Sequence, residues 1–284
     1  MSINRVVDIT ELAVMGEQFP LRLMQLGFRL FQVTDEVGRD QYRYVLPPVC
    51  EVPAGPFLMG SDPHFDKHAR DNEPPQQTID LPSFQIGTYP VTVAEYACAV
   101  QAGRLREPSE INGVFWHDQL QQLDHPVVCL RWHQASAYAA WLAHVTKQPW
   151  RLPTEIEWEK AARGTDGRIY PWGQQWDWET KRANAEDTES VGPGGTPTTP
   201  VGIYTEQGDA SPYGAHDMAG NVSEWTSTLY RDSPPTHHDV YVLRGGSWAW
   251  PPPYARTTNR STNAADTLGP DIGMRLVLSV SDEL

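Results

Sequence analysis

The stretch Tyr213-Gly-Ala-His-Asp-Met-Ala-Gly-Asn-Val-Ser-Glu-Trp-Thr226 decides the fold of this 284-residue chain. Two further glycine-bearing blocks follow it, Arg244-Gly-Gly-Ser-Trp248 and Asp271-Ile-Gly-Met-Arg275. Turn residues separate the blocks, and few long periodic segments occur after Gly164. A second half with short strands, many turns and many tryptophans is unlike a doubly wound sheet or a barrel of strands and helices.

The middle of the chain carries the clearest helix signals. Thr92 with Glu95 and Thr154 with Glu157 each form the spacing of a capping box, in which threonine and glutamate satisfy each other's backbone amides. Between them, residues 135–145 place large apolar side chains at one-face spacing. We therefore expect three helices, starting near residues 93, 135 and 155.

Eight blocks in a fixed order resemble the formylglycine-generating-enzyme (sulfatase-modifying factor) family over residues 49 to 280. Besides the three quoted above, they are Phe57-Leu-Met-Gly60, Tyr89-Pro-Val-Thr92, Arg151-Leu-Pro-Thr-Glu-Ile-Glu-Trp-Glu-Lys-Ala-Ala-Arg163, Tyr170-Pro-Trp-Gly173 and Pro200-Val-Gly202. The resemblance implies an α+β, C-type-lectin-like fold, rich in loops and poor in regular secondary structure.

Residues 1–48 precede this domain, which we assign to residues 49–284. Pro20 can open a short helix that Gly27 stops. The alternating stretches 28–33 and 42–46 flank a glycine-bearing polar segment, which predicts a β-hairpin. So short a segment cannot build its own core, so we expect it to pack onto the rest of the chain.

Composition limits the classes of function. The formal net charge is −14 and the pI is about 5.0, which disfavours nucleic acid as a partner. The three cysteines, Cys50, Cys98 and Cys129, lie in apolar surroundings without a CxxC, which favours buried free thiols and a cytoplasmic location. No apolar run has the length of a signal peptide or a membrane span.

The resemblance also locates the family's catalytic cysteines, three and eight residues beyond the serine of the Gly-Gly-Ser block. Counted from Ser247, these positions are Trp250 and Ala255. Neither side chain can form a thiolate or bind Cu(I), so we expect no copper and no oxidation by the family's mechanism. The alternative function is a metal-dependent oxidase, either of this type or of the sulfoxide-synthase branch. That branch takes iron-binding histidines from an N-terminal bundle, and residues 1–50 contain none.

Two structural calcium sites are implied by the same family. One would use Asn221, the carbonyl of Val222 and Glu224, and the other would use Asn184. These oxygen donors are the kind that calcium prefers. A capping box formed by Asn221 and Glu224 is the alternative interpretation of that pair.

A third branch of the fold comprises the variable proteins of diversity-generating retroelements, in which the segment after the Gly-Gly-Ser-Trp block is altered at adenines. That segment is residues 249–271 here. Asn codons mutated at their first two bases cannot yield Lys, Glu, Gln, Met or Trp. These types make up about a fifth of the chain, yet only Trp250 represents them in the segment. We therefore predict a non-catalytic, ligand-binding domain with a variable surface, and an unvarying binding domain of the same fold is the alternative.

The segment should contact a protein or another macromolecular ligand, with Trp250 and Tyr254 as aromatic anchors and small polar side chains around them. Arg256, Arg260 and Trp248 should hold it to the body, while its other side chains point into solvent. The predicted ligand-binding residues are Ala249, Trp250, Pro251, Pro253, Tyr254, Thr257, Thr258, Asn259, Ser261, Thr262, Asn263, Thr267 and Leu268.

Overall fold

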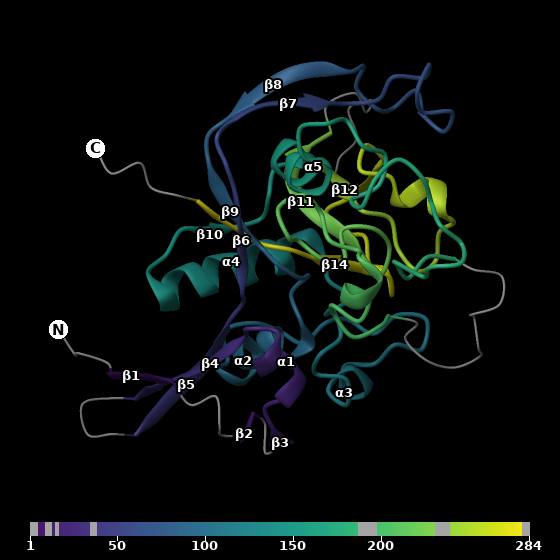
Figure 1. Ribbon diagram of the computed structural model, residues 1–284. Helices are drawn as coiled ribbons and strands as arrows, with labels where there is room; N and C mark the ends of the chain where they lie inside the picture. Colours follow the sequence, from purple (N-terminus) through teal and green to yellow (C-terminus); the bar gives the residue numbers. More distant parts are fainter. Residues whose placement is uncertain are drawn as a thin grey trace.

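The computed structural model describes residues 5–8, 13–14, 17–34, 39–186, 198–230 and 239–279. Its fold is of the mixed α+β type, with short strands in several small sheets and long connecting loops, as the sequence predicts (Figure 1). The helices are α1 (Leu21–Gln25), α2 (Val93–Gln101), α3 (Trp116–Gln119), α4 (Trp132–Thr146) and α5 (Glu155–Arg163), with 3-10 turns η1 (Thr205–Gln207) and η2 (Pro252–Ala255).

Two four-stranded sheets form the body. The first has the order β10-β15-β9-β6 and is antiparallel throughout. The second has the order β13-β12-β11-β14, and its β11–β14 pair is parallel. The strands are β6 (Val49–Val52), β9 (Phe84–Gly87), β10 (Trp150–Arg151), β11 (Ser223–Leu229), β12 (Val240–Arg244), β13 (Arg260–Ala264), β14 (Ile272–Met274) and β15 (Val277–Ser279).

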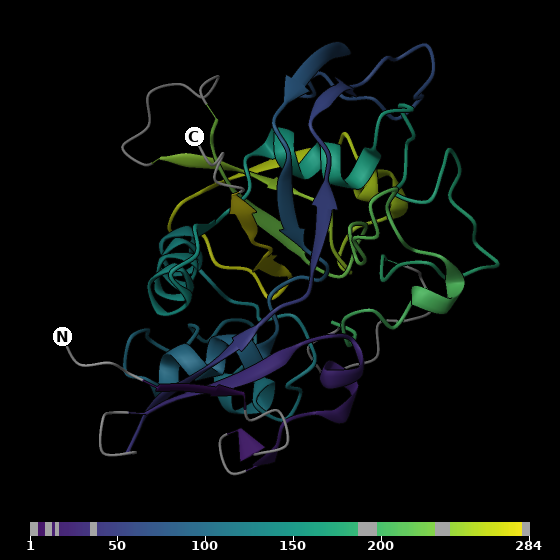
Figure 2. The ribbon, with the colours of Figure 1, turned by 60° about the vertical axis from the view of Figure 1, so that its left-hand side comes forward.

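The remaining strands form smaller units. β7 (Gly55–Met59) and β8 (Gln77–Leu81) make a two-stranded ribbon at the top of Figure 1. β1 (Arg5–Asp8), β4 (Arg29–Thr34) and β5 (Asp40–Leu46) make a three-stranded antiparallel sheet at the bottom of Figures 1 and 2. β2 (Ala13–Val14) pairs with β3 (Glu17–Gln18).

Two of the N-terminal elements, the helix α1 and the hairpin of β4 and β5, are predicted from the sequence, whereas β1, β2 and β3 are not. α1 follows Pro20 and is followed by Gly27 in a left-handed conformation at φ +92°. β4 and β5 form the predicted hairpin. Their buried side chains, among them Leu30 and Val45, belong to the same hydrophobic cluster as those of α2 and α4. Residues 19–34 and 39–46 therefore share a core with the body, and Figure 2 shows the sheet of β4 and β5 lying against α2.

The predicted capping boxes are confirmed at α2 and α5. The Thr92 amide donates to Glu95 Oε2 at 2.6 Å, and the Thr154 amide donates to Glu157 Oε2 at 2.8 Å. α4 begins at Trp132, slightly earlier than predicted, because the Gln134 side chain accepts a hydrogen bond from the Arg131 amide at 3.1 Å. Within the described ranges, none of the helices combines the length and the apolar character that a bilayer span needs.

Candidate functional site

The predicted binding segment divides into a buried part and a more exposed part. We name residues 249–254 the outer turn and residues 255–260 the inner strip. Thr257, Thr258 and Asn259 of the inner strip are at most 2% exposed. The prediction that these three side chains point into solvent is therefore wrong. Their polarity suggested a surface, but the Thr257 hydroxyl donates to the Arg168 carbonyl at 3.0 Å and the Thr258 hydroxyl accepts from Arg256 at 3.0 Å.

Arg256 fixes the inner strip to the loop between β7 and β8. Its guanidinium is fully buried and donates hydrogen bonds to Asp66 through Nη1 and to Glu73 through Nη2. Burial opposes the positive charge, but Glu73 and Asp66 outweigh it and raise the pKa of Arg256 above its usual value. Asp66 and Glu73 lie in a stretch whose composition indicates a surface loop, and Arg256 is the reason that both are buried.

A second cluster of charged residues holds the strip to α5. Glu159 of α5 accepts hydrogen bonds from Arg163 at 3.1 Å and from Arg244 of β12 at 2.6 Å. Arg244 also donates to the carbonyl oxygens of Thr257, at 2.7 Å, and Thr258, at 3.1 Å. The backbone of the strip is thus held by a buried arginine.

Arg260 ends the strip at the start of β13. Its Nη2 donates to Glu155 Oε1 at 2.8 Å, and its Nη1 donates to the carbonyl of Asn72 at 3.2 Å. The prediction that Arg256 and Arg260 anchor the segment agrees with these contacts. Trp248 is half-buried, so its burial is less complete than that of the two arginines.

The outer turn presents an aromatic stack beside a cation. The Trp250 and Tyr254 rings stack with centroids 4.9 Å apart and an interplanar angle of 29°. The guanidinium carbon of Arg70 lies 3.7 Å from the centroid of the Tyr254 ring. Trp250 is 46% exposed, and its carbonyl accepts a hydrogen bond from the Glu186 amide at 2.9 Å. Sequence reasoning missed Arg70, which is 184 positions before Tyr254 and is brought to it only by the fold.

The C-terminal part of the segment lies against a different part of the body. Ser261, Thr262 and Asn263 are half-buried in β13, which pairs with β12. Beyond β13, the carbonyls of Ala265 and Gly269 accept hydrogen bonds from the amides of Trp132 and Cys129. Thr267 and Leu268, both half-buried, lie in this turn. The five residues of β13 extend over roughly 13 Å, so the two ends of the segment do not share one compact face.

The positions of the family's catalytic cysteines hold no thiol. Trp250 stacks on Tyr254, and Ala255 is 1% exposed. The backbone is close-packed here, since a Cβ added to Gly246 would lie 2.6 Å from the Tyr254 carbonyl oxygen. The chain's three cysteines are free. Burial raises the pKa of Cys50, and it raises the pKa of Cys98 and of Cys129 to about 12, so all three favour the protonated thiol.

The predicted calcium donors are engaged with one another and with other protein groups. Asn221 Oδ1 accepts hydrogen bonds from the Asn184 side chain at 3.3 Å and from the Thr199 amide at 3.0 Å. Val222 is buried in a hydrophobic cluster with Cys129. Asn221 and Asn184, which are predicted for two separate calcium sites, thus lie together, and the Asn221 oxygen already has two donors.

The carboxylate of Glu224 is already paired with other protein groups. It lies in β11, so the alternative of a helix capping box is wrong. Its carboxylate accepts hydrogen bonds from Arg275, at 2.9 to 3.2 Å, and from the Trp158 indole, at 2.6 Å. A carboxylate paired with a buried guanidinium does not fit as a calcium ligand. In the described part of the chain, no group of three or more His, Cys, Asp or Glu side chains is placed to hold a metal ion.

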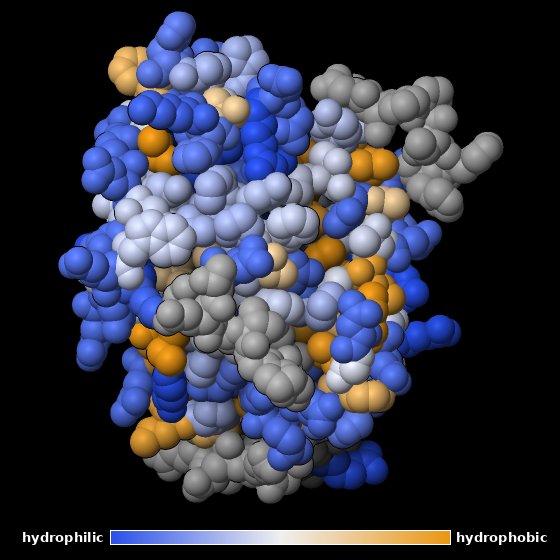
Figure 3. Space-filling model, turned by 90° about the vertical axis from the view of Figure 1, so that its right-hand side faces the viewer, coloured by the Kyte–Doolittle hydropathy of each residue, from blue (hydrophilic) through white to orange (hydrophobic). Residues whose placement is uncertain are grey.

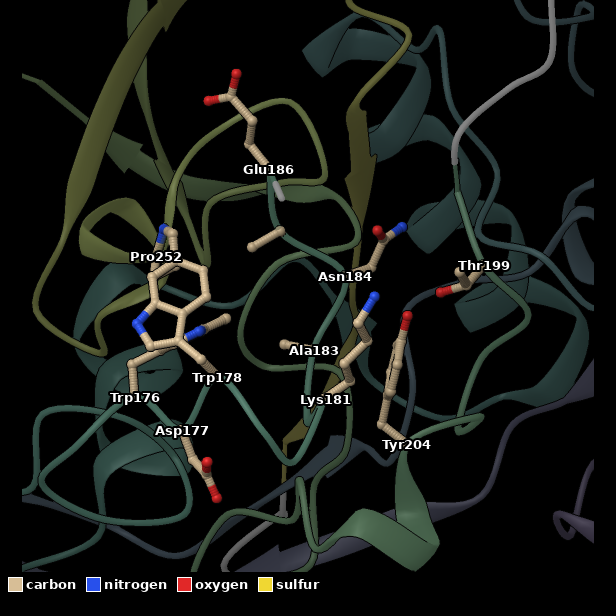
Figure 4. A pocket seen from close by; sticks show the side chains of 11 residues that line it. Trp176, Asp177, Trp178, Lys181, Ala183, Asn184, Glu186, Thr199, Tyr204 and Pro252 are labelled. Atoms are coloured by element: carbon tan, nitrogen blue, oxygen red, sulfur yellow. The ribbon is translucent and has the colours of Figure 1, made fainter. Parts of the chain in front are cut away.

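Two cavities border the segment. One, of about 570 Å³, lies beside the inner strip and is lined by Asp66, Arg163 and Thr258 among others. The other, of about 210 Å³, lies beside the outer turn and is lined by Pro252 and by aromatic and polar side chains of residues 176–204 (Figure 4). Sequence reasoning missed this second cavity. The pair Trp176 and Trp178 was the available signal, in a stretch that resembles a run of turns.

Comparison with known proteins identifies three kinds of relative, one of which is the formylglycine-generating enzymes, such as that of Streptomyces coelicolor, 30% identical over 283 residues that cover 79% of this chain and 87% of that protein. The chain is 33% identical over 255 residues to hercynine oxygenase of Mycolicibacterium smegmatis, covering 74% of this chain and 56% of that protein. It thus spans about half the length of the hercynine oxygenases that it matches. It is 29% identical over 283 residues to the mouse protein named inactive C-alpha-formylglycine-generating enzyme 2, covering 82% and 86% of the two chains.

Solved structures confirm the fold. PvdO from Pseudomonas aeruginosa superposes with a TM-score of 0.69 at 25% identity, covering 82% of this chain and 95% of that one. Variable protein 1 of Treponema denticola superposes with a TM-score of 0.61 at 21% identity, covering 84% and 96%. The C-type-lectin-like fold expected from the sequence is therefore correct.

A model of one protein family matches residues 35–280, most of the chain and part of the N-terminal hairpin. The match includes β5, the helices α2 to α5 and every strand of the two four-stranded sheets. The chain belongs to the family of sulfatase-modifying factor enzyme 1-like domains, the formylglycine-generating-enzyme family.

Proposed function

We propose that this chain is a non-catalytic domain that binds a protein ligand through its outer turn. The observation that carries the proposal is the replacement of the two family cysteines by Trp250 and Ala255. The family's oxidation requires a thiolate, which neither residue can supply. The mouse relative whose name describes it as inactive supports a non-catalytic branch of the family.

The chemistry of the outer turn suits recognition. Tryptophan, tyrosine and arginine are the residues most enriched where interfaces hold their binding energy. Trp250, Tyr254 and Arg70 bring one of each together, and stacking fixes their orientations before a partner arrives. Figure 3 shows one face of the molecule, on which hydrophilic groups predominate and hydrophobic groups are scattered.

The proposal includes a variable surface of restricted extent. In a display protein of this kind, substitutions must leave the fold intact, so the variable codons should be those of exposed or half-buried positions. Among the predicted ligand-binding residues, these are Ala249, Trp250, Pro251, Pro253, Tyr254, Ser261, Thr262, Asn263, Thr267 and Leu268. The buried Thr257, Thr258 and Asn259 would remain constant.

Site-specific photo-cross-linking tests the binding face. We expect a chain with benzoylphenylalanine at position 250 to form one discrete adduct in cells that express it naturally. The same group at exposed Glu206 serves as the matched control, and position 267 tests the far end of the segment. An adduct of equal yield at 206, or none at 250, contradicts the proposed face.

The alternative, a metal-dependent oxidase, is supported by the 33% identity to hercynine oxygenase. Cu(I) titration and oxygen uptake with a cysteine-bearing peptide test the copper-dependent, formylglycine-generating form of this alternative on one preparation. We expect neither binding nor uptake from the natural chain, and the Trp250→Cys/Ala255→Cys variant is the positive control for copper. One equivalent of copper with turnover in the natural chain would overturn the non-catalytic proposal.

A further inference from the structure

Arg70, in the loop between β7 and β8, lies on the outer turn. Its guanidinium carbon is 3.7 Å from the centroid of the Tyr254 ring, and that ring stacks on Trp250 with centroids 4.9 Å apart. Stacked carbon atoms touch at roughly 3.5–4.0 Å, so the guanidinium lies flat against the tyrosine ring. Two segments that are far apart in the sequence therefore join in one stack of three side chains, which we name the arginine stack.

The edge of the Arg70 guanidinium is open to a ligand. Its five N–H bonds lie in the plane of the group, so a ring against one face leaves them free to donate sideways. In the part of the chain that the structure describes, no acceptor takes a hydrogen bond from this side chain and no carboxylate lies within ion-pair distance of it. Arg70 is half-buried, but its nitrogens are not among the buried, unpartnered polar atoms of the described residues, so solvent reaches them. The arginine stack thus holds an oriented cation with accessible donors.

The arginines that hold the inner strip have no such freedom. Arg244, Arg256 and Arg260 each bind a buried carboxylate of the body or of the β7–β8 loop. The chain has 36 acidic side chains against 22 lysines and arginines, so carboxylates are plentiful. Pairing within the fold accounts for the three arginines of the strip, but it does not account for Arg70. A carboxylate supplied from outside would complete its hydrogen bonding.

The charges near Arg70 make direct contact the source of any preference for an anion. Asp66 and Glu73 of the same loop are buried and both bind Arg256, and exposed Asp71 lies outside ion-pair distance of Arg70. With a net charge of −14, the chain as a whole repels an approaching anion at long range. A bidentate pair of a guanidinium and a carboxylate is short and directional, so it can outweigh that repulsion at contact.

The rest of the arginine stack offers an apolar surface beside the cation. Trp250 is 46% exposed, although it stacks on Tyr254. Tryptophan and arginine are among the residues that most often carry the binding energy of an interface. A ligand that meets both would place an apolar side chain on the indole and a carboxylate at the guanidinium.

We propose that the protein ligand pairs an acidic side chain, aspartate or glutamate, with Arg70 and lays a neighbouring apolar side chain on Trp250. This inference rests on the proposed function, since it names the chemistry of the partner at the same face. The step is association alone, and no bond is made or broken.

NMR titration with a pair of tetrapeptides tests the proposal. The probes are acetyl-Gly-Phe-Glu-Gly-amide and the same peptide with Gln in place of Glu, which are nearly isosteric and differ in charge. We expect the acidic probe to bind about fivefold more tightly, because a charged bidentate hydrogen bond is stronger than a neutral one even where solvent screens it. Its titration should shift the signals of the Arg70 side-chain N–H groups and of the Trp250 indole N–H.

Variants at Arg70 separate the guanidinium from general charge. Arg70→Met should abolish the preference for the acidic probe, and Arg70→Lys, which keeps the charge but not the planar fork, should reduce it. The matched control is Lys67→Met, which removes one exposed positive charge from the same loop and should leave the preference unchanged. Because each variant is titrated with both probes, a general loss of binding does not alter the ratio of their affinities.

Several outcomes overturn the proposal. They are equal affinity for the two probes, absence of binding by both, and an effect of Lys67→Met as large as that of Arg70→Met. A third probe, acetyl-Gly-Phe with a free C-terminal carboxylate, tests the source of the carboxylate. Tighter binding of this probe than of the acidic tetrapeptide overturns the assignment to a side chain.

The cross-linking experiment at position 250 distinguishes this inference from the proposed function on which it rests. If the adduct forms but the acidic probe is not preferred, only the assignment of a carboxylate to Arg70 fails. If no adduct forms, the protein-binding face itself fails, whatever the affinities of the probes.

Discussion

The inner strip and the outer turn are neighbours in sequence, but they differ in polarity and in burial, and the more polar of the two is the more buried. Residues 257–259 are Thr-Thr-Asn, small and hydrophilic, yet they are at most 2% exposed. Trp250 is the largest side chain of the outer turn, yet it is 46% exposed. From hydropathy alone, one would expect the inner strip to be exposed and the outer turn to be buried.

The difference lies in what the fold provides beneath each stretch. Under the inner strip, Arg244 pairs with the carbonyls of Thr257 and Thr258, and the carbonyl oxygens of Arg168 and Ile169 accept from the hydroxyl and amide of Thr257. A buried polar group costs little when it is paired. The outer turn has fewer such partners, and its rings stack on each other instead. Polar composition in a loop-rich fold therefore does not identify a surface.

The largest effect should come from Arg256→Ala, which removes the attachment of the strip to the β7–β8 loop. It leaves Asp66 and Glu73 buried without their cation, a loss on the order of 3–5 kcal/mol in the free energy of unfolding. Chemical denaturation measures it. The matched control, Arg104→Ala at an exposed arginine, should stay within about 0.5 kcal/mol. Equal stability of the two variants would show that the inner strip is not held as described.

A smaller effect is expected from Thr257→Val, which keeps the shape of the side chain and removes its hydroxyl. That hydroxyl donates to the Arg168 carbonyl at 3.0 Å, and leaving the carbonyl unpaired should cost about 1–3 kcal/mol of unfolding free energy. Thr262→Val on half-buried β13 is the control, with a change of about 0.5 kcal/mol or less. If Thr262→Val destabilises more, the boundary between buried and exposed positions is misplaced.

The smallest effect should come from Trp250→Ser in the outer turn. Its indole is half in solvent, so we expect a loss of at most about 1 kcal/mol, chiefly from the stack with Tyr254. Trp158→Ala, at a fully buried indole, should cost about 3–5 kcal/mol by comparison. Thermal unfolding of both variants measures the difference. A Trp250→Ser variant as unstable as Trp158→Ala would mean that the outer turn belongs to the core.

Local features were predictable because their causes are local. The helix starts at Thr92 and Thr154 depend on residues three positions apart, and the hairpin of β4 and β5 depends on alternation within each strand. The anchoring roles of Arg256 and Arg260 were also inferred in advance, because a charged residue between small ones needs a partner. Their partners, Glu73 and Glu155, lie more than 100 positions away and could not be paired from sequence.

At the predicted calcium sites, by contrast, local spacing does not determine the role of a residue. Asn221 and Glu224 have the spacing of ligands and equally of a helix cap, and the structure assigns neither role to Glu224. Arg275, 51 positions later, takes its carboxylate instead. A local sequence pattern cannot show which distant charged residue pairs with a carboxylate in the folded chain.

The sequence by itself determined the family, the α+β fold, the positions of the helices and the absence of the two catalytic cysteines. Each of these follows from residue identity and short-range spacing. Only the tertiary structure decided which polar residues are buried, that Arg70 lies on Tyr254, and that Trp178, Lys181, Tyr204 and Pro252 line one cavity. The reason is that burial and charge pairing depend on contacts between segments far apart in the chain, and those contacts exist only once the whole core has formed.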